Sequence, residues 1–240
     1  MAIVNNMKIG VVIPVYNEAA VIESVVRDLY GKVIRKIPGA TLTVAEDGST
    51  DGTKGILARL NTELPFILSS AADRKGYTAA FKNALGSIDA DWVFFSDSDG
   101  QHEPEDIFKL LAEAGDNDII SGYKRTRHDP LYRVIISKAY NLLIRALFGL
   151  NLKDIDSGFK LIRASVIKAV LPEVGKFRYC VMSEFVLRAH LKGYRVKELP
   201  VTHYPRKCGQ SAIFSPAKLP LIAWGLLKNL WELKFYGAAK

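Results

Sequence analysis

The sequence of 240 residues has few cysteines and lacks a long uncharged apolar run. Its two cysteines, Cys180 and Cys208, lie in neither a CxxC pattern nor a Cys/His spacing, which argues against zinc and against a disulfide framework and favours a reducing compartment. The N-terminus lacks a basic segment followed by a long apolar stretch, so we predict no signal peptide. The apolar run Ile9–Val15 is too short to cross a bilayer. We therefore expect a cytoplasmic protein.

Two common nucleotide-binding patterns are also missing. No GxGxxG follows a predicted strand, and Gly48–Gly55 lacks the GK[ST] ending of a P-loop. Their absence disfavours dinucleotide oxidoreductases and P-loop NTPases. The formal net charge of +8 indicates a phosphate-bearing partner or an anionic surface without identifying it, and we expect no nucleic acid partner.

Short β-rich runs alternate with helical patterns in the first half, which predicts an α/β fold with a mostly parallel sheet flanked by helices. The expected strands are Lys8–Pro14, Thr41–Glu46, Pro65–Ser70, Asp91–Ser96, Asp118–Ser121 and Arg195–Val201. The expected helices are Glu18–Lys36, Asp51–Leu60, Lys75–Ile88, Pro104–Ala114, Asp129–Gly149 and Met182–Lys192, with a last helix from Pro216. We divide the chain into a main domain, 1–212, and an amphipathic helical extension, 213–240.

The sharpest chemical feature is the acidic stretch that follows the apolar run Trp92–Phe95. Asp97 and Asp99 alternate, so on an extended strand both carboxylates face one side, and Gln101 continues the alternation. Two or three oxygen ligands with open positions suit Mg²⁺ or Mn²⁺ bridging a diphosphate. The plainer alternative is a surface turn with solvated carboxylates. The position after a buried strand favours the metal interpretation.

Two earlier turns also follow predicted strands. Glu46 and Asp47 end one strand, where a carboxylate can accept hydrogen bonds from a nucleobase or a ribose, although a well-made strand–turn–helix connection explains them too. Tyr16, with Asn17 and Glu18 behind it, could stack on a base or simply pack. Ligands in open α/β sheets bind beyond the carboxyl ends of the strands, where these turns fall.

Taken in order, these segments resemble the family 2 glycosyltransferases of the GT-A fold. The turn Asp73–Gly76, the stretch Gly122–Arg125 with Asp129–Leu131, the motif Asp154–Lys160 and the segment Arg206–Ser211 extend the similarity to the dolichol-phosphate mannosyltransferase-like branch, over residues 8 to 212. The chain departs from this pattern by having Glu46-Asp47 in place of Asp-Asp, and at Lys207, Cys208 and Ala212.

The resemblance implies a role for each matching position. The residues implied to hold the donor are Pro14, Tyr16, Glu18, Glu46, Asp47, Lys75 and Ser98, and those implied to hold Mg²⁺ or Mn²⁺ are Asp97, Asp99 and Gln101. Arg206 and Ser211 fall in a segment implied to close over the diphosphate, with Arg206 neutralising the leaving group.

The expected reaction is inverting transfer of a sugar from a UDP- or GDP-linked donor to a polyprenyl phosphate. A phosphate dianion needs no general base, but it needs cations to position it. The basic residues of suitable position are Lys124, Arg125, Arg127 and Arg133, which a solvated face would explain as well. Asp156 could orient the acceptor or an arginine.

Three other functions stay open at this point. A family 2 enzyme that acts on a polysaccharide or a soluble hydroxyl would need a base such as Asp156 or Glu184. A non-catalytic nucleotide-binding module and a nucleotidyltransferase are the remaining alternatives. The sugar, the base, the lipid and the oligomeric state are not determined by the sequence.

Peripheral contact with a membrane is expected from two apolar helices. Leu142–Leu150 and Leu219–Phe235 carry leucine and aromatic residues between basic ones, which is typical of helices in the plane of an interface, although core packing explains the same residues.

Overall fold

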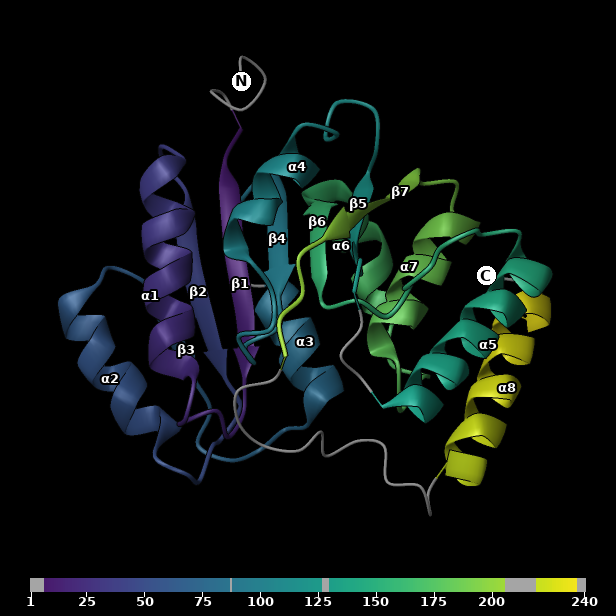
Figure 1. Ribbon diagram of the computed structural model, residues 1–240, viewed down its shortest axis with the longest axis horizontal. Coiled ribbons are helices and arrows are strands. Elements are labelled where there is room, and N and C mark those ends of the chain that lie inside the picture. The colour runs from purple at the N-terminus through teal and green to yellow at the C-terminus, as the bar shows by residue number, and fades with distance from the viewer. Residues whose placement is uncertain (1–6, 87, 127–129, 206–218, 237–240) are drawn as a thin grey trace.

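The computed structural model describes residues 7–86, 88–126, 130–205 and 219–236. Within them a seven-stranded sheet has the order β3-β2-β1-β4-β6-β5-β7 (Figure 1). The strands are β1 (Ile9–Val15), β2 (Thr41–Glu46), β3 (Ile67–Ser70), β4 (Trp92–Ser96), β5 (Ile119–Lys124), β6 (Phe159–Arg163) and β7 (Val196–Val201). β6 runs antiparallel to both of its neighbours, and the other strand pairs are parallel. The prediction of a mostly parallel sheet is confirmed.

Helices cover the two faces and the far end of this sheet (Figure 1). They are α1 (Ile22–Lys32), α2 (Thr53–Glu63), α3 (Tyr77–Gly86), α4 (Ile107–Leu111), α5 (Leu131–Phe148), α6 (Ala164–Val170), α7 (Val181–Leu191) and α8 (Leu219–Tyr236). Two predicted helices are shorter than expected, because Ile34–Lys36 and Pro104–Asp106 form 3₁₀ turns at their ends. The long predicted helix ends as expected at Gly149, whose positive φ of 72° closes α5.

Alternate residues of the central strands bury opposite faces of the sheet. Val12 and Phe95 point into one apolar cluster, which includes residues of α3, α5, α7 and α8. Val11 and Phe94 point into the other, which includes residues of α1, α2 and α4. Every residue of β1 is buried, as expected for a strand covered on both faces. The two clusters therefore fix the strands rigidly and leave their carboxyl ends to carry the site.

The sequence did not predict β6 and α6. The strand β6 is short and contains Lys160, which breaks the apolar run that would have indicated a buried strand. Lys160 is nevertheless 0% exposed, because β6 lies between β4 and β5 in the middle of the sheet. Only the tertiary structure could place a lysine there.

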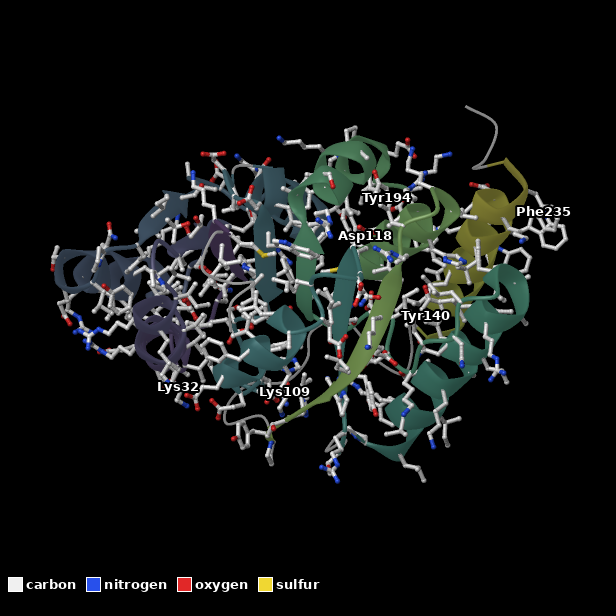
Figure 2. The ribbon with its side chains drawn as sticks, turned by 90° about the horizontal axis from the view of Figure 1, so that it is seen from above. Lys32, Lys109, Asp118, Tyr140, Tyr194 and Phe235 are labelled. Carbon is white, nitrogen blue, oxygen red and sulfur yellow. The ribbon has the colours of Figure 1, made fainter. Side chains whose placement is uncertain are left out.

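The helices α5 and α8 lie side by side at one end of the molecule in both views (Figures 1 and 2). Leu230 and Leu233 of α8 join the same apolar cluster as Phe148 of α5, and the Lys234 ammonium lies 5.6 Å from the Phe148 ring centre. Among the described residues, none of the helices has the length and apolar character needed to span a bilayer. The boundary between the predicted domains, 1–212 and 213–240, falls outside the described residues and stays a prediction.

Candidate active site

The sheet opens between β1 and β4 at their carboxyl ends. These strands pair only from Ile9 with Trp92 to Val12 with Phe95. Beyond that point β1 continues with β2 alone, and Pro14 has no backbone N–H with which to extend the ladder towards β4. The strand order also reverses here, because β2 lies on one side of β1 and β4 on the other. Such an opening is where α/β sheets bind ligands.

Two turns close one side of the opening, and we call residues 16–19 and 46–53 the nucleoside turns. Asn17 has a left-handed backbone, with φ of 54°; its N–H donates to Ser49 Oγ over 2.9 Å, and its Oδ1 accepts the Thr50 N–H over 2.8 Å. The Glu18 N–H donates to Thr53 Oγ1 over 3.0 Å. These bonds join the turns that follow β1 and β2. The structure thus brings together Tyr16, Glu18 and the Glu46–Asp47 pair.

The two carboxylates at the end of β2 are already engaged by the protein. Glu46 accepts the Ser49 N–H with one oxygen and the Ser70 hydroxyl, at 2.7 Å, with the other. Burial acts to raise the pKa of Glu46, but these hydrogen bonds outweigh it, and the pKa lies below its ordinary value. Asp47 accepts the Lys75 and Gly76 N–H groups at 2.9 and 3.0 Å. Both carboxylates therefore also hold the protein's own turns in place.

The turn 73–76 packs directly on the nucleoside turns. A Cβ on Gly48 would lie 2.4 Å from the Arg74 backbone nitrogen, so only glycine allows this approach. The Arg74 guanidinium lies 4.1 Å from the centre of the Tyr16 ring. Lys75 contributes its backbone N–H to Asp47, while its side chain is exposed.

The other side of the opening is the loop 97–101, which we call the metal loop. Asp97 and Asp99 are partly buried, whereas Ser98 is buried. The Asp97 N–H donates to the Gly158 carbonyl over 2.9 Å, and a Cβ on Gly158 would lie 2.0 Å from Asp97 Oδ2. Gly158 therefore leaves the space that the Asp97 carboxylate occupies.

The predicted strand alternation through Asp99 and Gln101 is wrong. The strand β4 ends at Ser96, and Gly100 turns the chain with a positive φ of 70°. Asp99 Oδ1 instead accepts the Gln101 N–H over 3.2 Å. A compact turn, rather than an extended strand, brings the two carboxylates together.

The metal loop is paired with the segment that precedes Arg206. Gln101 exchanges two hydrogen bonds with the Tyr204 backbone: its carbonyl accepts the Tyr204 N–H over 2.7 Å, and its Nε2 donates to the Tyr204 carbonyl over 3.0 Å. His102 and His203 form an isolated antiparallel bridge beside it. Arg206 and Ser211 themselves lie outside the described residues, as does Arg127.

The Asp97 carboxyl lies where negative charge gathers. Burial, and then the nearby Asp99 carboxylate, raise the pKa of Asp97 to about 7, and Asp156 adds to this while Lys124 and Lys160 oppose it. Within the described chain, no three His, Cys, Asp or Glu side chains gather where they could hold a metal ion by themselves. Any cation at Asp97 and Asp99 thus needs further oxygen ligands of another kind.

Asp156 lies at the N-terminus of α7, beside the metal loop. Its Oδ1 accepts the Ser183 N–H over 3.1 Å and the Ser183 hydroxyl over 2.9 Å. The residue keeps an exposed side, but the surrounding protein raises the pKa of Asp156, an effect that the Ser183 bonds oppose. The structure thus supports an oriented carboxylate at this position.

The turn 153–158, which carries Asp156, is fixed from several elements. The Ile155 N–H donates to Asn141 Oδ1 of α5 over 3.0 Å, and the Lys160 ammonium donates to the Ser157 carbonyl over 2.6 Å. The Glu198 carboxylate of β7 accepts two consecutive N–H groups at the start of the turn, at 2.7 and 2.8 Å. Asn141, Lys160 and Glu198 were not predicted as site residues. Asn141 and Glu198 reach this turn from distant elements, and Lys160 lies in the unpredicted strand β6.

Arg133 and Glu184 differ in burial and in their hydrogen-bond partners. Arg133 lies partly buried in the first turn of α5, which begins near the edge of the sheet where β1 and β4 end (Figure 1). Glu184 is 0% exposed, and its carboxylate accepts three backbone N–H groups of residues 175–177 and two bonds from Arg188. Glu184 is therefore structural, and it is excluded as a general base.

Residues 10–171 match the sequence pattern described as Glycosyl transferase family 2, which covers more than half of the chain. The chain belongs to this family. The opening between β1 and β4 and the metal loop lie within the matched residues, whereas α7, β7 and α8 follow them. The resemblance drawn from the motifs is confirmed, and the protein is a glycosyltransferase.

Two curated relatives match over nearly their whole length. The undecaprenyl-phosphate mannosyltransferase of Micrococcus luteus is 30% identical over 94% of this chain and 97% of its own. The polyprenol monophosphomannose synthase of Mycolicibacterium smegmatis is 30% identical over 92% of this chain and 88% of its own.

Solved structures show the same fold at lower identity. Glucosyl-3-phosphoglycerate synthase from Mycobacterium tuberculosis, in complex with Mn²⁺, UDP and phosphoglyceric acid, is 20% identical with a TM-score of 0.71, over 95% of this chain and 80% of that one. Mannosyl-3-phosphoglycerate synthase from Rubrobacter xylanophilus has a TM-score of 0.65 at 13% identity. Both similarities concern the GT-A fold.

Proposed function

We propose that this family 2 enzyme transfers a sugar, with inversion, from a UDP- or GDP-linked donor to a polyprenyl phosphate. The observation that carries the donor half is the opening between β1 and β4, with the nucleoside turns on one side and the metal loop on the other. The acceptor half is supported by the two polyprenyl phosphate transferases that match along nearly their full length.

The nucleoside would lie against the nucleoside turns. Tyr16 supplies an aromatic face, already in contact with Arg74, and the carboxylates of Glu46 and Asp47 have lone pairs left for base or ribose donors, because each oxygen can accept two bonds. Pro14, Glu18 and Lys75 are also proposed to line this side, and Ser98 is proposed to contact the donor from the metal loop.

Asp97, Asp99 and Gln101 would hold a divalent cation, Mg²⁺ or Mn²⁺. Their donor set fits such an ion, since carboxylate and amide oxygens are hard ligands and phosphate oxygens of the donor can complete the shell. Gln101 Nε2 donates to the Tyr204 carbonyl, so the atom of this side chain proposed as a cation ligand is the amide oxygen. When bound, the cation would neutralise charge that develops on the departing diphosphate.

The acceptor would approach from the side of Asp156 and α5. A polyprenyl phosphate is largely dianionic at pH 7, so its oxygen can attack without a general base. Lys124, Arg133 and Arg206 are proposed to position and neutralise the phosphates, and Asp156, held by Ser183, to orient one of these cations or the acceptor. Excluding Glu184 as a base weakens the alternative of a soluble hydroxyl acceptor, because Asp156 is then the remaining candidate base proposed from the sequence.

Membrane contact is supported by the outward faces of α5 and α8. The large hydrophobic residues exposed there are Leu131, Tyr132, Ile135, Ile136 and Leu142 on α5, and Leu221, Trp224, Leu227, Trp231 and Phe235 on α8. Figure 2 shows Phe235 pointing away from the molecule. The opposite side of α8 is also apolar and packs into the core. The exposed apolar residues of α8 are therefore not needed to fill that core. Exposed tryptophans among lysines are typical of an interfacial helix. The cytoplasmic location stays a prediction.

Release of nucleoside diphosphate from a panel of UDP- and GDP-sugars tests this function. Each donor is offered with Mg²⁺ or Mn²⁺, with and without a polyprenyl phosphate, and with a chelator. We expect release that needs both the metal and the lipid phosphate. Release that ignores the lipid would exclude the acceptor, and nucleotide binding without release would indicate a non-catalytic module.

The variant Arg133→Ala separates the two halves of the site. Use of the lipid acceptor should fall about tenfold or more, as expected when one charge contact to a phosphate is lost, while nucleotide binding stays unchanged. Lys138→Ala, on the exposed side of the same helix, is the matched control. Equal loss of acceptor use and nucleotide binding in Arg133→Ala would contradict the assignment.

A further inference from the structure

Tyr77 is an aromatic residue at the site to which the sequence motifs assign no role. It is the first residue of α3 and follows the two N–H groups of Lys75 and Gly76 that the Asp47 carboxylate holds. The start of α3 is therefore fixed beside the carboxyl end of β2. In spite of this anchoring, 43% of the Tyr77 side chain remains exposed.

A series of aromatic contacts places Tyr77 at the level of the metal loop. The Tyr77 ring stacks one helical turn above Phe81, with ring centres 6.4 Å apart, and Phe81 meets the edge of Phe95 in β4 at 5.4 Å. One turn of α3 spans about 5.4 Å, and two residues of β4 span about 6.6 Å. Asp97 follows Phe95 by two residues, just past the end of β4, so the Tyr77 ring and Asp97 lie at about the same height along the sheet.

The charges that act on the Tyr77 hydroxyl lead to the same position. Burial of its hydroxyl end, and then the negative charges of Asp97 and Asp156, raise the pKa of Tyr77 well above its ordinary value. Together with the contacts through Phe81 to Phe95, this places Tyr77 on the side of the opening where Asp97 and Asp156 lie.

We propose that Tyr77 contacts the transferred sugar and helps to select it. The inference rests on the proposed function, in which the donor diphosphate lies at Asp97 and the acceptor at Asp156, so that the sugar must lie between them. The half-exposed ring offers an apolar face on which the C–H groups of a hexose can stack, and the phenol offers one hydrogen-bonding group to a sugar hydroxyl.

Binding measurements on Tyr77→Leu and Tyr77→Phe test the proposal without needing an acceptor. The quantity measured by calorimetry is the ratio of the dissociation constants for a nucleoside diphosphate sugar and for the matching nucleoside diphosphate, both with Mn²⁺. We expect Tyr77→Leu to weaken binding of the sugar nucleotide about tenfold relative to that of the nucleotide, and Tyr77→Phe to have a smaller effect. Tyr194→Phe is the control, because Tyr194 precedes the amino end of β7, at the opposite edge of the sheet from the metal loop, and it should leave the ratio unchanged.

Kinetics on the same variants provide the second measurement. The order of preference among UDP-glucose, UDP-N-acetylglucosamine and GDP-mannose should change in Tyr77→Leu. An unchanged ratio and an unchanged order would overturn the proposal, and so would an equal loss of nucleotide and sugar-nucleotide affinity, since that would indicate a role in folding or in nucleoside binding. A wild-type enzyme that binds sugar nucleotides but ignores lipid phosphate would refute the proposed acceptor while leaving the binding test of Tyr77 valid.

Discussion

The fold shifts the pKa values of carboxylates on the two sides of the opening in opposite directions. On the nucleoside side, hydrogen bonds from the protein lower the pKa values of Glu46 and Asp51 against the effect of burial. On the side of the metal loop, burial and neighbouring charge raise the pKa values of Asp97 and Asp156. One side is electrostatically satisfied without a ligand, and the other carries negative charge that a ligand has to balance.

This difference indicates that the nucleoside turns and the metal loop have different roles in the site. The nucleoside turns are a preorganised scaffold, because the bonds of Asn17, Glu46 and Asp47 exist before any donor arrives. In the metal loop, by contrast, the raised pKa of Asp97 means that a bound cation, as proposed, would stabilise the charged carboxylate. Substitutions on the two sides should therefore differ in whether they affect stability or activity.

The largest effect is expected for Asp99→Ala. Loss of one of the two proposed carboxylate ligands should lower the rate of metal-dependent release of nucleoside diphosphate by about 100-fold or more, because the leaving group loses its counter-charge. Asp116→Ala, an exposed aspartate remote from the opening, serves as the control. Full activity of Asp99→Ala would remove the metal loop from the mechanism.

Gly158→Ala tests the metal side through its packing. The added methyl group would lie 2.0 to 2.3 Å from the Asp97 carboxylate, which then has to move. We expect Mn²⁺ affinity, measured by titration in the presence of nucleoside diphosphate, to fall about tenfold, equivalent to about 1.4 kcal/mol.

Gly115→Ala is the matched control for Gly158→Ala, because a Cβ at Gly115 meets no atom within 4 Å. An unchanged Mn²⁺ affinity in Gly158→Ala would show that Asp97 does not need its present position.

On the nucleoside side, Asp47→Asn should affect stability as well as binding. The amide would present an N–H group to one of the Lys75 and Gly76 N–H donors, leaving a partly buried donor unpaired. The expected loss is about 1–3 kcal/mol of unfolding free energy, measured with urea, together with weaker nucleotide binding. A fully stable variant that fails only in catalysis would contradict the view of these turns as scaffold.

The smallest effect is expected for Asp97→Asn, which should increase the unfolding free energy instead of lowering it. Because the folded pKa of Asp97 is about 7, and thus higher than in the unfolded chain, the folded state holds an extra proton between about pH 4 and 7. Stability therefore falls as pH rises through that range, and Asp97→Asn removes the loss. In a chelator at pH 8 we expect Asp97→Asn to gain roughly 1 kcal/mol of unfolding free energy, and to gain nothing below pH 4. A less stable variant at pH 8 would mean that Asp97 is already balanced without a cation.

Much of the site was accessible from the sequence, because its residues follow strands directly. Tyr16, Glu46, Asp47 and Asp97 each come at or just after the end of a strand, and the ends of neighbouring parallel strands meet at one edge of a sheet. Local alternation misled us only beyond Asp97, where Gly100 bends the chain.

The strand–helix alternation, the family and the carboxylates at the strand ends could be predicted from the sequence, since these depend on local periodicity and on short motifs. The environment of each carboxylate depends on the folded chain. The tertiary structure placed Lys160 inside the sheet, committed Glu184 to backbone amides, left Gly158 as the space for Asp97 and brought Tyr77 level with the metal loop. These outcomes depend on burial and on contacts between distant segments, and no local pattern encodes the dielectric surroundings that set a pKa.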